Sequence, residues 1–302
     1  MRKYRFGISG LCCLLLILYG CSSLDQSFEF VFMTDIHVQP EQRADQGYTA
    51  AIEAVNALHP DFVLTGGDLI MDALGQSFGR ADSLYHLFNG LTVQFTMPVY
   101  HTIGNHEVFG WYERSGISPQ HAEYGKRMYL NRLDYDQTYY SFDHKGWHFI
   151  VLDAIGYENH GHIGYVDSLQ LQWLKADLDS LELDVPVAVS THIPFFSVYN
   201  QMRNGSTAAN GRGSVITNAS EVMDAFEGTN LKLVLQGHLH AVEDIHYRDT
   251  HFITGGAVSG KWWEGPRDGF PEGFVVVKIK GKEFSWDYHT FGWEAEILNE
   301  NE

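Results

Sequence analysis

The stretch FEFVFMTDIH (residues 28–37) runs from a largely apolar segment directly into a pair of polar side chains. Its apolar part predicts a buried β-strand, and two further apolar runs alternate with two stretches of helical spacing. The apolar runs lie at residues 28–33, 61–66 and 98–103, and the helical stretches lie at residues 48–58 and 77–91. This βαβαβ order predicts parallel strands that are covered by helices.

The second half of the chain predicts more strands and one clear helix. Residues 138–153 contain two β-rich runs around His144–Gly146, which indicates an antiparallel hairpin. Residues 167–181 form an amphipathic pattern with Asp167 as the expected cap, and residues 186–191 and 231–237 predict two buried strands. The sequence therefore predicts one α/β domain at residues 26–295, with a β-rich part from about residue 244. Two packed sheets with outer helices and a single mixed sheet are both compatible with this pattern.

The N-terminal residues predict an exported protein. Residues 1–20 combine a basic start with an apolar run that is too short to span a membrane comfortably, which is typical of a signal peptide. The run ends in Leu18-Tyr19-Gly20-Cys21, which resembles a bacterial lipoprotein signal with Cys21 as the lipidated residue. The expected location is the cell envelope, as a periplasmic or cell-surface lipoprotein anchored to the membrane through Cys21; an ordinary cleaved signal peptide is the alternative.

Charge and cysteine content limit the possible functions. All three cysteines lie within the first 21 residues, so the mature domain has no disulfide and no thiolate metal ligand. The formal net charge of −18 argues against a nucleic-acid partner bound through a basic surface. It does not exclude a small phosphoester, because bound divalent cations reverse the local charge.

Five short polar clusters each follow a predicted strand. They are Asp35-Ile36-His37, Gly67-Asp68, Gly104-Asn105-His106-Glu107, Thr191-His192 and Gly237-His238-Leu239-His240. Ligands in open α/β sheets bind beyond the carboxyl ends of the strands, so these clusters are expected to converge on one site. In extended backbone, residues two apart point to the same side, which would align Asp35 with His37 and His238 with His240.

The chemistry of these side chains indicates a metal site. Imidazole, carboxylate and amide ligands without sulfur suit Zn, Mn or Fe(II). The set is too large for one tetrahedral ion, but it suits two divalent ions that share a carboxylate. Two such ions about 3.5–4 Å apart hold an activated hydroxide and stabilise an in-line phosphoryl displacement.

In this order, the five motifs resemble those of the calcineurin-like metallophosphoesterase superfamily. The resemblance implies a four-layer α/β/β/α sandwich of two mixed sheets, a dinuclear centre, and attack of a metal-bridging hydroxide on the phosphorus of a phosphomonoester or phosphodiester. The implied ligands are Asp35, His37 and His240 for the first ion, Asn105, His192 and His238 for the second, and Asp68 as the bridge. His106 would not bind metal but would assist the leaving group.

Some residues depart from the patterns of related enzymes. Met71 stands where purple acid phosphatases have an iron-binding tyrosine and where many relatives have an aspartate that orients the catalytic histidine. The nearest carboxylate, Asp72, lies one residue after this position. Metallo-β-lactamases also contain H-x-H, but they need an aspartate at the position that Val242 occupies.

Several residues outside the motifs are further candidates. Arg203 and Arg212 lie in the long irregular stretch at residues 194–213 and are candidates for phosphate contacts. Trp262 and Trp263 would form an aromatic wall or pack at a sheet edge. His160 and His162, within residues 157–165, are expected in a loop, where they would form a pocket wall. The alternative function is a non-catalytic surface lipoprotein that binds a phosphorylated ligand or a glycan. Substrate and oligomeric state stay open.

Overall fold

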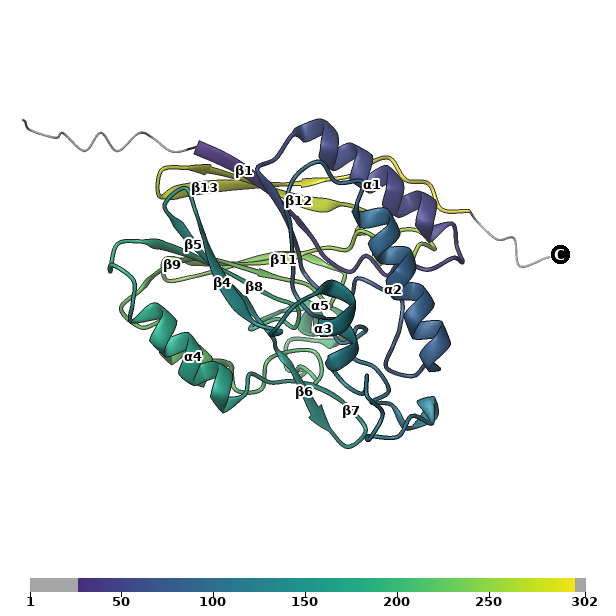
Figure 1. Cartoon of the computed structure of the whole chain (residues 1–302). Helices are drawn as coiled ribbons and strands as arrows, with labels where there is room; N and C mark the ends of the chain where they lie inside the picture. The colour runs from purple at the N-terminus through teal and green to yellow at the C-terminus, as the bar shows by residue number, and fades with distance from the viewer. Residues whose placement is uncertain (1–26, 297–302) are drawn as a thin grey trace, which may run out of the picture.

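The computed structural model describes residues 27–296, whose strands form two large sheets that lie one above the other (Figure 1). The first sheet has the order β13-β12-β1-β2-β3. Strands β1, β2 and β3 are parallel, while β12 and β13 form an antiparallel hairpin that adds to β1. The bounds are Ser27–Met33 (β1), Phe62–Thr65 (β2), Val99–His101 (β3), Phe274–Lys280 (β12) and Glu283–His289 (β13).

The second sheet has the order β10-β11-β9-β8-β5-β4. Its four inner strands are parallel, and β4 and β10 pair antiparallel at the two edges. The bounds are Tyr140–His144 (β4), Trp147–Leu152 (β5), Pro186–Thr191 (β8), Asn230–Gln236 (β9), Val242–Tyr247 (β10) and Thr250–Gly255 (β11). Both sheets are therefore mixed, and both direct the ends of several parallel strands toward the same region.

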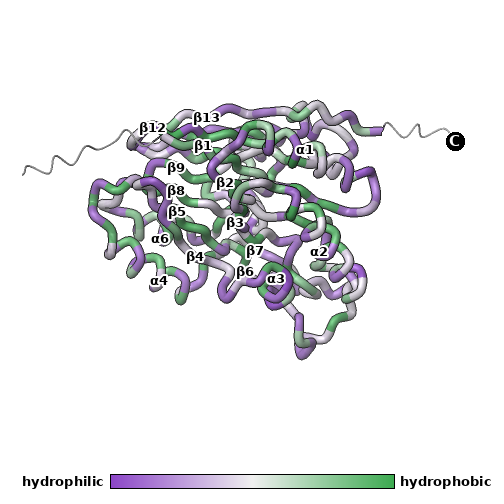
Figure 2. Tube along the Cα trace, turned by 45° about the horizontal axis from the view of Figure 1, so that its top comes forward, coloured by the Kyte–Doolittle hydropathy of each residue, from purple (hydrophilic) through white to green (hydrophobic). Residues whose placement is uncertain are grey.

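Aromatic side chains fill the space between the sheets. Phe30 of β1 stacks on Phe62 of β2 with ring centroids 4.9 Å apart, and it meets Phe149 of β5 edge-on at 5.4 Å. These contacts tie the first sheet to the second through buried apolar area. Figure 2 shows the same pattern, with hydrophobic segments gathered along the inner strands and hydrophilic segments at the outer turns.

Helices cover the outer faces of both sheets. Helices α1 (Ala44–Leu58) and α2 (Phe78–Thr92) share one apolar cluster with alternate residues of β1 and β2, and α4 (Ser168–Leu178) packs on the second sheet. Asp167 caps α4 as predicted, since its carboxylate accepts hydrogen bonds from the backbone N–H groups of Leu169 and Gln170. The arrangement confirms the predicted four-layer α/β/β/α sandwich.

Three local expectations were wrong. Helix α1 begins at Ala44 rather than Tyr48. The preceding residue, Arg43, makes no side-chain capping hydrogen bond, so the sequence contains no capping signal for this start. Residues 157–165, expected as a loop, contribute to a small hairpin of β6 (Ile155–Glu158) and β7 (Gly161–Gly164). The irregular stretch at residues 194–213 contains the short helix α5 (Tyr199–Asn204).

The remaining elements are short. They are the 3-10 turn Glu113–Ser115 and the helices α3 (Arg127–Leu133) and α6 (Ala219–Asp224). Within residues 27–296, no helix has both the length and the apolar character needed to cross a membrane. The expected signal peptide and Cys21 lie outside the described residues.

Candidate metal centre

The polar clusters at the strand ends meet at one place, but their backbone is not extended. Asp35, His37, Asp68, His238 and His240 all have positive φ angles, between 47° and 72°. The sequence expectation of extended D-x-H and H-x-H segments was therefore wrong. Left-handed conformations are costly for residues with a Cβ, and they persist at functional sites where surrounding contacts determine them.

Backbone hydrogen bonds between neighbouring strand ends hold this conformation. The Asp35 N–H donates to the Gly67 carbonyl at 3.0 Å, and the His37 N–H donates to the Asp68 carbonyl at 2.9 Å. The ladder between β1 and β2 thus continues past both strands into the loops. The side chains are consequently placed by backbone contacts between loops as well as by the strands.

Asp35, His37 and His240 form the first group of potential ligands. The Nε2 atom of His240 lies 3.2 Å from Oδ1 of Asp35 and 3.1 Å from Nε2 of His37. Asp35 and His37 are fully buried, and His240 is almost so. Three donor atoms from β1 and β9 loops therefore point at one small volume.

Asp68, Asn105, His192 and His238 form the second group. The Nε2 atom of His192 is at its centre: it lies 3.1 Å from Oδ2 of Asp68, 3.2 Å from Oδ1 of Asn105 and 3.2 Å from Nδ1 of His238. These residues follow β2, β3, β8 and β9. Four separate strand ends thus supply a second, adjacent set of donors.

Asp68 lies between the two groups. Its Oδ2 atom is 3.1 Å from Nε2 of His192 and 3.7 Å from Nε2 of His37. Its Oδ1 atom accepts a hydrogen bond from the backbone N–H of His106 at 2.9 Å, which fixes the rotation of the carboxylate. This position is the one that a carboxylate shared by two ions requires.

The donor set fits divalent cations. Oδ1 of Asp35 and Nδ1 of His37 are buried without a hydrogen-bond partner among the described residues. Burial lowers the pKa of His37 to about 4 and that of His238 to about 3, so both imidazoles are neutral at pH 7. Against the effect of burial, the Asp68 carboxylate raises the pKa of His192 to about 9, so a metal ion would displace a proton from this ring. Although burial alone would raise it, the neighbouring histidines hold the pKa of Asp35 well below its usual range. The cluster can accept two ions through nitrogen and oxygen atoms.

Backbone and hydroxyl groups behind the ligands orient them. Nδ1 of His192 donates to the Gly66 carbonyl at 2.8 Å, and Nδ1 of His240 donates to the Gly260 carbonyl at 2.5 Å. The Thr34 hydroxyl donates to Oδ2 of Asp35 at 2.6 Å. Such contacts select the ring orientation and tautomer that leave the other nitrogen free for a metal.

His106 is oriented by a backbone carbonyl. Its Nδ1 atom donates to the carbonyl of Met71, and its Nε2 atom lies 3.8 Å from Oδ2 of Asp68 at the cavity wall. Asp72 is engaged elsewhere, with Gln76 at 3.1 Å and Arg114 at 3.6 Å. Burial opposes it, but Asp68 raises the pKa of His106 above its ordinary value. The Met71 carbonyl thus orients His106, and Asp72, one residue further along the chain, does not contact its ring.

Glu107 and Gly104 have structural tasks beside the centre. The buried Glu107 carboxylate accepts four backbone N–H groups, those of Asp68, Leu69, Ile70 and Gly104. A Cβ on Gly104 would lie 2.2 Å from the Asp68 N atom and 2.3 Å from its Oδ1 atom. Gly104 is therefore needed for close approach to Asp68.

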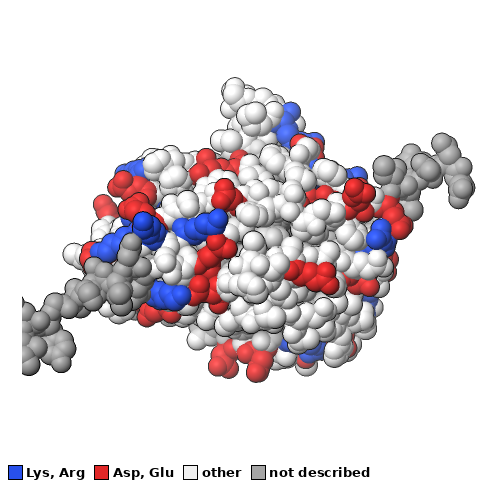
Figure 3. Space-filling model, turned by 90° about the horizontal axis from the view of Figure 1, so that it is seen from above, with Lys and Arg blue, Asp and Glu red and all other residues white. Residues whose placement is uncertain are grey.

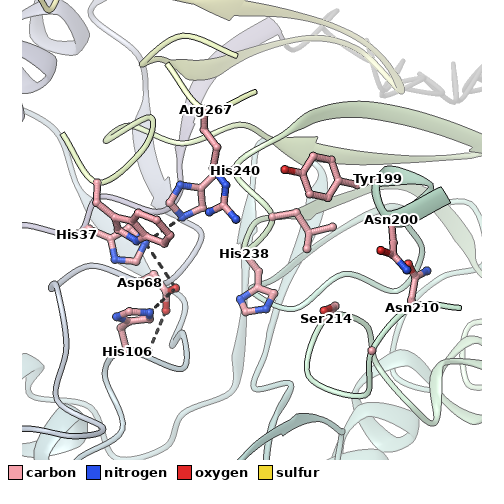
Figure 4. Close-up of a pocket in the computed structure, with 13 residues that line it drawn as sticks. His37, Asp68, His106, Tyr199, Asn200, Asn210, Ser214, His238, His240 and Arg267 are labelled. Atoms are coloured by element: carbon pink, nitrogen blue, oxygen red, sulfur yellow. Dashed lines mark hydrogen bonds and ion pairs between the residues drawn. The ribbon is translucent and has the colours of Figure 1, made fainter. Parts of the chain in front are cut away.

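The centre opens into a cavity of about 330 Å³ (Figure 4). Figure 4 shows His37, Asp68, His106, His238 and His240 on one side of it, with Tyr199, Asn200, Asn210 and Ser214 across the opening and Arg267 above. The wall also contains Gly211, Leu239 and Trp262.

Candidates from the sequence lie in different places around this cavity. Arg203 pairs with Asp268 and Arg212 pairs with Glu158, and neither arginine lines the cavity. Trp262 lines it, whereas Trp263 is buried beneath and donates to the Ile36 carbonyl at 3.0 Å.

The sequence did not indicate Arg267, and it indicated His162 only as a loop residue. The ring of His162 lies 5.7 Å from that of His238, because the unexpected β6–β7 hairpin brings it next to the centre. Arg267 lines the cavity. A single arginine in the segment GPRDG carries no motif, so no sequence signal marked it.

Comparison with protein families identifies the family of the chain. The sequence model of the calcineurin-like phosphoesterase family matches residues 28–242, and a model for the C terminal of calcineurin-like phosphoesterase matches residues 253–298. The chain belongs to the calcineurin-like phosphoesterase family. A search of curated proteins found no match.

Solved structures show the same fold at low sequence identity. A dimetal phosphatase from Danio rerio matches 87% of this chain and 99% of its own, with a TM-score of 0.59 and 17% identity. GAP50, described as the anchor in the inner membrane complex of Plasmodium, matches 90% of this chain and 87% of its own, with a TM-score of 0.53 and 14% identity. Purple acid phosphatase PPD1 from yellow lupin matches 91% of this chain and 53% of its own, with a TM-score of 0.57 and 12% identity.

Proposed function

We propose that this chain is a two-metal phosphoesterase that hydrolyses small phosphomonoesters or phosphodiesters outside the cytoplasm. The observation that supports this best is the position of Asp68, whose Oδ2 atom lies between the His37 and His192 nitrogens. One ion would be held by Asp35, His37 and His240, and the other by Asn105, His192 and His238. Asp68 would bind both ions.

Bound divalent cations would supply Lewis-acid charge and lower the pKa of a coordinated water. The chain's own residues would then position the substrate and move the proton. His106 reaches the cavity wall with Nε2 while the Met71 carbonyl holds Nδ1, so it can donate a proton to the leaving oxygen.

The location is part of the proposal. An exported lipoprotein anchored at Cys21 would meet nutrient phosphoesters or lipid headgroups rather than cytoplasmic nucleotides. On the face shown in Figure 3, acidic and basic side chains are interspersed and form no continuous basic surface, which is compatible with a small-molecule substrate. Mass spectrometry of the mature N-terminus would test lipidation of Cys21.

Turnover of generic substrates tests the activity. We expect p-nitrophenyl phosphate or bis(p-nitrophenyl) phosphate to be hydrolysed in the presence of Mn²⁺, Zn²⁺ or Fe²⁺, and the activity to disappear with a chelator. Metal analysis of the same preparation would count the bound ions. Two bound ions without turnover of either ester would contradict the proposal and favour a ligand-binding lipoprotein.

A further inference from the structure

Arg267 is a cation of the cavity wall that has no carboxylate partner among residues 27–296. Its guanidinium carbon lies 4.9 Å from the ring centroid of Trp262, and within the described residues its side chain forms no hydrogen bond or ion pair, although the neighbouring Asp268 carboxylate attracts its charge. The adjacent carboxylate of Asp268 is already engaged by the Tyr199 hydroxyl and by Arg203. Arg267 therefore keeps its donors free, on a side chain that is only half-buried.

Trp262 contributes a second free donor to the same wall. Its Nε1–H is buried and has no acceptor among the described residues. Its ring centroid lies 5.4 Å from that of His240, so a single indole separates the Arg267 guanidinium from the potential metal ligands. Two donors without a protein acceptor, close to the metal centre, are available to the oxygen atoms of a bound molecule.

The rest of the wall supports an anionic ligand. Asp68 is the one carboxylate among the lining residues, and the side across the opening carries the neutral polar groups of Tyr199, Asn200, Asn210 and Ser214. A further negative charge near that side is the Asp268 carboxylate, which accepts from the Tyr199 hydroxyl and is paired with Arg203. Since the Arg267 guanidinium covers the Trp262 ring, the indole is a less suitable platform for a planar base than for holding the arginine in place.

We propose that Arg267 and Trp262 form a subsite for a second anionic group, carboxylate or phosphate, on the leaving group of the substrate. This inference rests on the proposed phosphoesterase function and deepens it. The preferred substrates are phosphoesters that carry a negative charge away from the scissile phosphoryl group. Arg267 is the specificity-determining residue, because its planar fork can bind carboxylate or phosphate oxygens in a bidentate manner.

Two substrate pairs that differ in the second charge test the subsite. 3-Phosphoglycerate is compared with glycerol 3-phosphate, and fructose 1,6-bisphosphate with fructose 6-phosphate. The two pairs differ in the distance between the scissile phosphoryl group and the second anion. For the metal-loaded wild type, we expect kcat/KM to be about 10-fold or more higher for the charged member of at least one pair, mainly through KM. Calorimetric binding of the same four compounds provides a second readout.

Variants then assign the preference. Arg267→Gln is expected to abolish this preference, and Arg267→Lys to retain part of it. Arg248→Gln is the matched control, because Arg248 stacks on Tyr247 at 5.2 Å on the exposed β10–β11 turn and does not line the cavity. It should keep the full preference.

The outcomes separate this subsite from the function on which it rests. Equal kcat/KM within both pairs, or a preference that survives in Arg267→Gln, would overturn the subsite while the phosphoesterase stands. Absence of metal-dependent turnover for all esters would overturn the phosphoesterase function. In that case the calorimetric comparison of wild type and Arg267→Gln still decides whether Arg267 selects a second anion.

Discussion

His106 occupies a position where a histidine can act either as a ligand or as an acid. Its geometry alone does not exclude metal binding, because His37, Asp68 and His106 also lie within reach of one ion. One observation favours the acid: the His106 side chain is 23% exposed, whereas His37, His192 and His240 are buried. A partly exposed imidazole that binds no metal can exchange a proton with a leaving group.

Replacing His106 should therefore separate binding from turnover. We expect His106→Ala to keep both ions and to lose about 100-fold to 10,000-fold in kcat, the usual contribution of general acid catalysis. Metal content by mass spectrometry and steady-state kinetics on the same sample provide the measurement. A variant that loses an ion and keeps its activity per remaining ion would show that His106 is a ligand.

Glu107 stabilises the loops of the centre rather than the chemistry. Burial raises the pKa of Glu107, and the backbone donors that it accepts counteract this shift. In Glu107→Gln, one oxygen would be replaced by an NH₂ group that faces backbone N–H donors. We expect a loss of about 1–3 kcal/mol in the free energy of unfolding, measured by urea titration. Glu53→Gln on the exposed side of α1 is the control, and an equal effect of both substitutions would refute this role.

The elements that carry the site could largely be predicted. Strands β1, β2, β8 and β9 have near-continuous apolar runs, and the polar clusters that follow them mark the edge where they end. The left-handed backbone at Asp35 and His37 could not be predicted, because it depends on hydrogen bonds to a loop distant in sequence. The β6–β7 hairpin was missed for a similar reason: its strands have four residues each and little apolar alternation.

The loop after β3 tolerates no side chain at Gly104. We expect Gly104→Ala to displace Asp68, because the new Cβ would meet its backbone nitrogen and carboxylate. Affinity for both ions and the thermal unfolding temperature should fall together, as measured by calorimetry. Gly90→Ala in α2 is the matched control: a Cβ there meets nothing within 4 Å, and it should stabilise the helix by about 0.5–1 kcal/mol. Normal metal affinity in Gly104→Ala would contradict the packing argument.

At the scale of the whole molecule, buried histidines make stability depend on pH. His101 at the end of β3 is buried, contacts Thr65 at 3.1 Å, and has its pKa lowered to about 4 by burial. In the unfolded chain His101 binds a proton near pH 6.5, whereas in the folded protein it stays neutral down to about pH 4. The contribution of neutral His101 to the free energy of unfolding is therefore full above pH 6.5 and is lost as the pH falls toward 4.

His101→Gln should reduce this acid sensitivity. In urea titrations of the chelator-treated protein, we expect the loss of unfolding free energy between pH 6.5 and pH 4.5 to shrink by up to about 1.4 kcal/mol per pH unit. His86→Gln on the exposed surface of α2 serves as the control and should leave the pH slope unchanged. An identical slope in wild type and His101→Gln would refute the assignment.

The two sheets meet at a centre whose donors come from both of them, so metal binding should couple to global stability. Asp35 and Asp68 follow strands of the first sheet, whereas His192 and His238 follow strands of the second. Ions that bind the folded state alone raise its free energy of unfolding by about 2.7 kcal/mol at a concentration 100 times the dissociation constant. A chelator should therefore lower the melting temperature, and added Mn²⁺ or Zn²⁺ should restore it.

Asp68 and Asp35 should differ in this coupling. Asp68→Asn removes the carboxylate between the groups, so we expect both ions to bind more weakly and most of the metal-dependent rise in melting temperature to disappear. Asp35→Asn should weaken one ion and keep part of that rise, and Asp136→Asn on the surface should behave as wild type. Calorimetry with and without metal, together with ion counts, measures all three. If Asp68→Asn changed the affinity of one ion and left the other intact, Asp68 would belong to one group, and the two ions would not share a ligand.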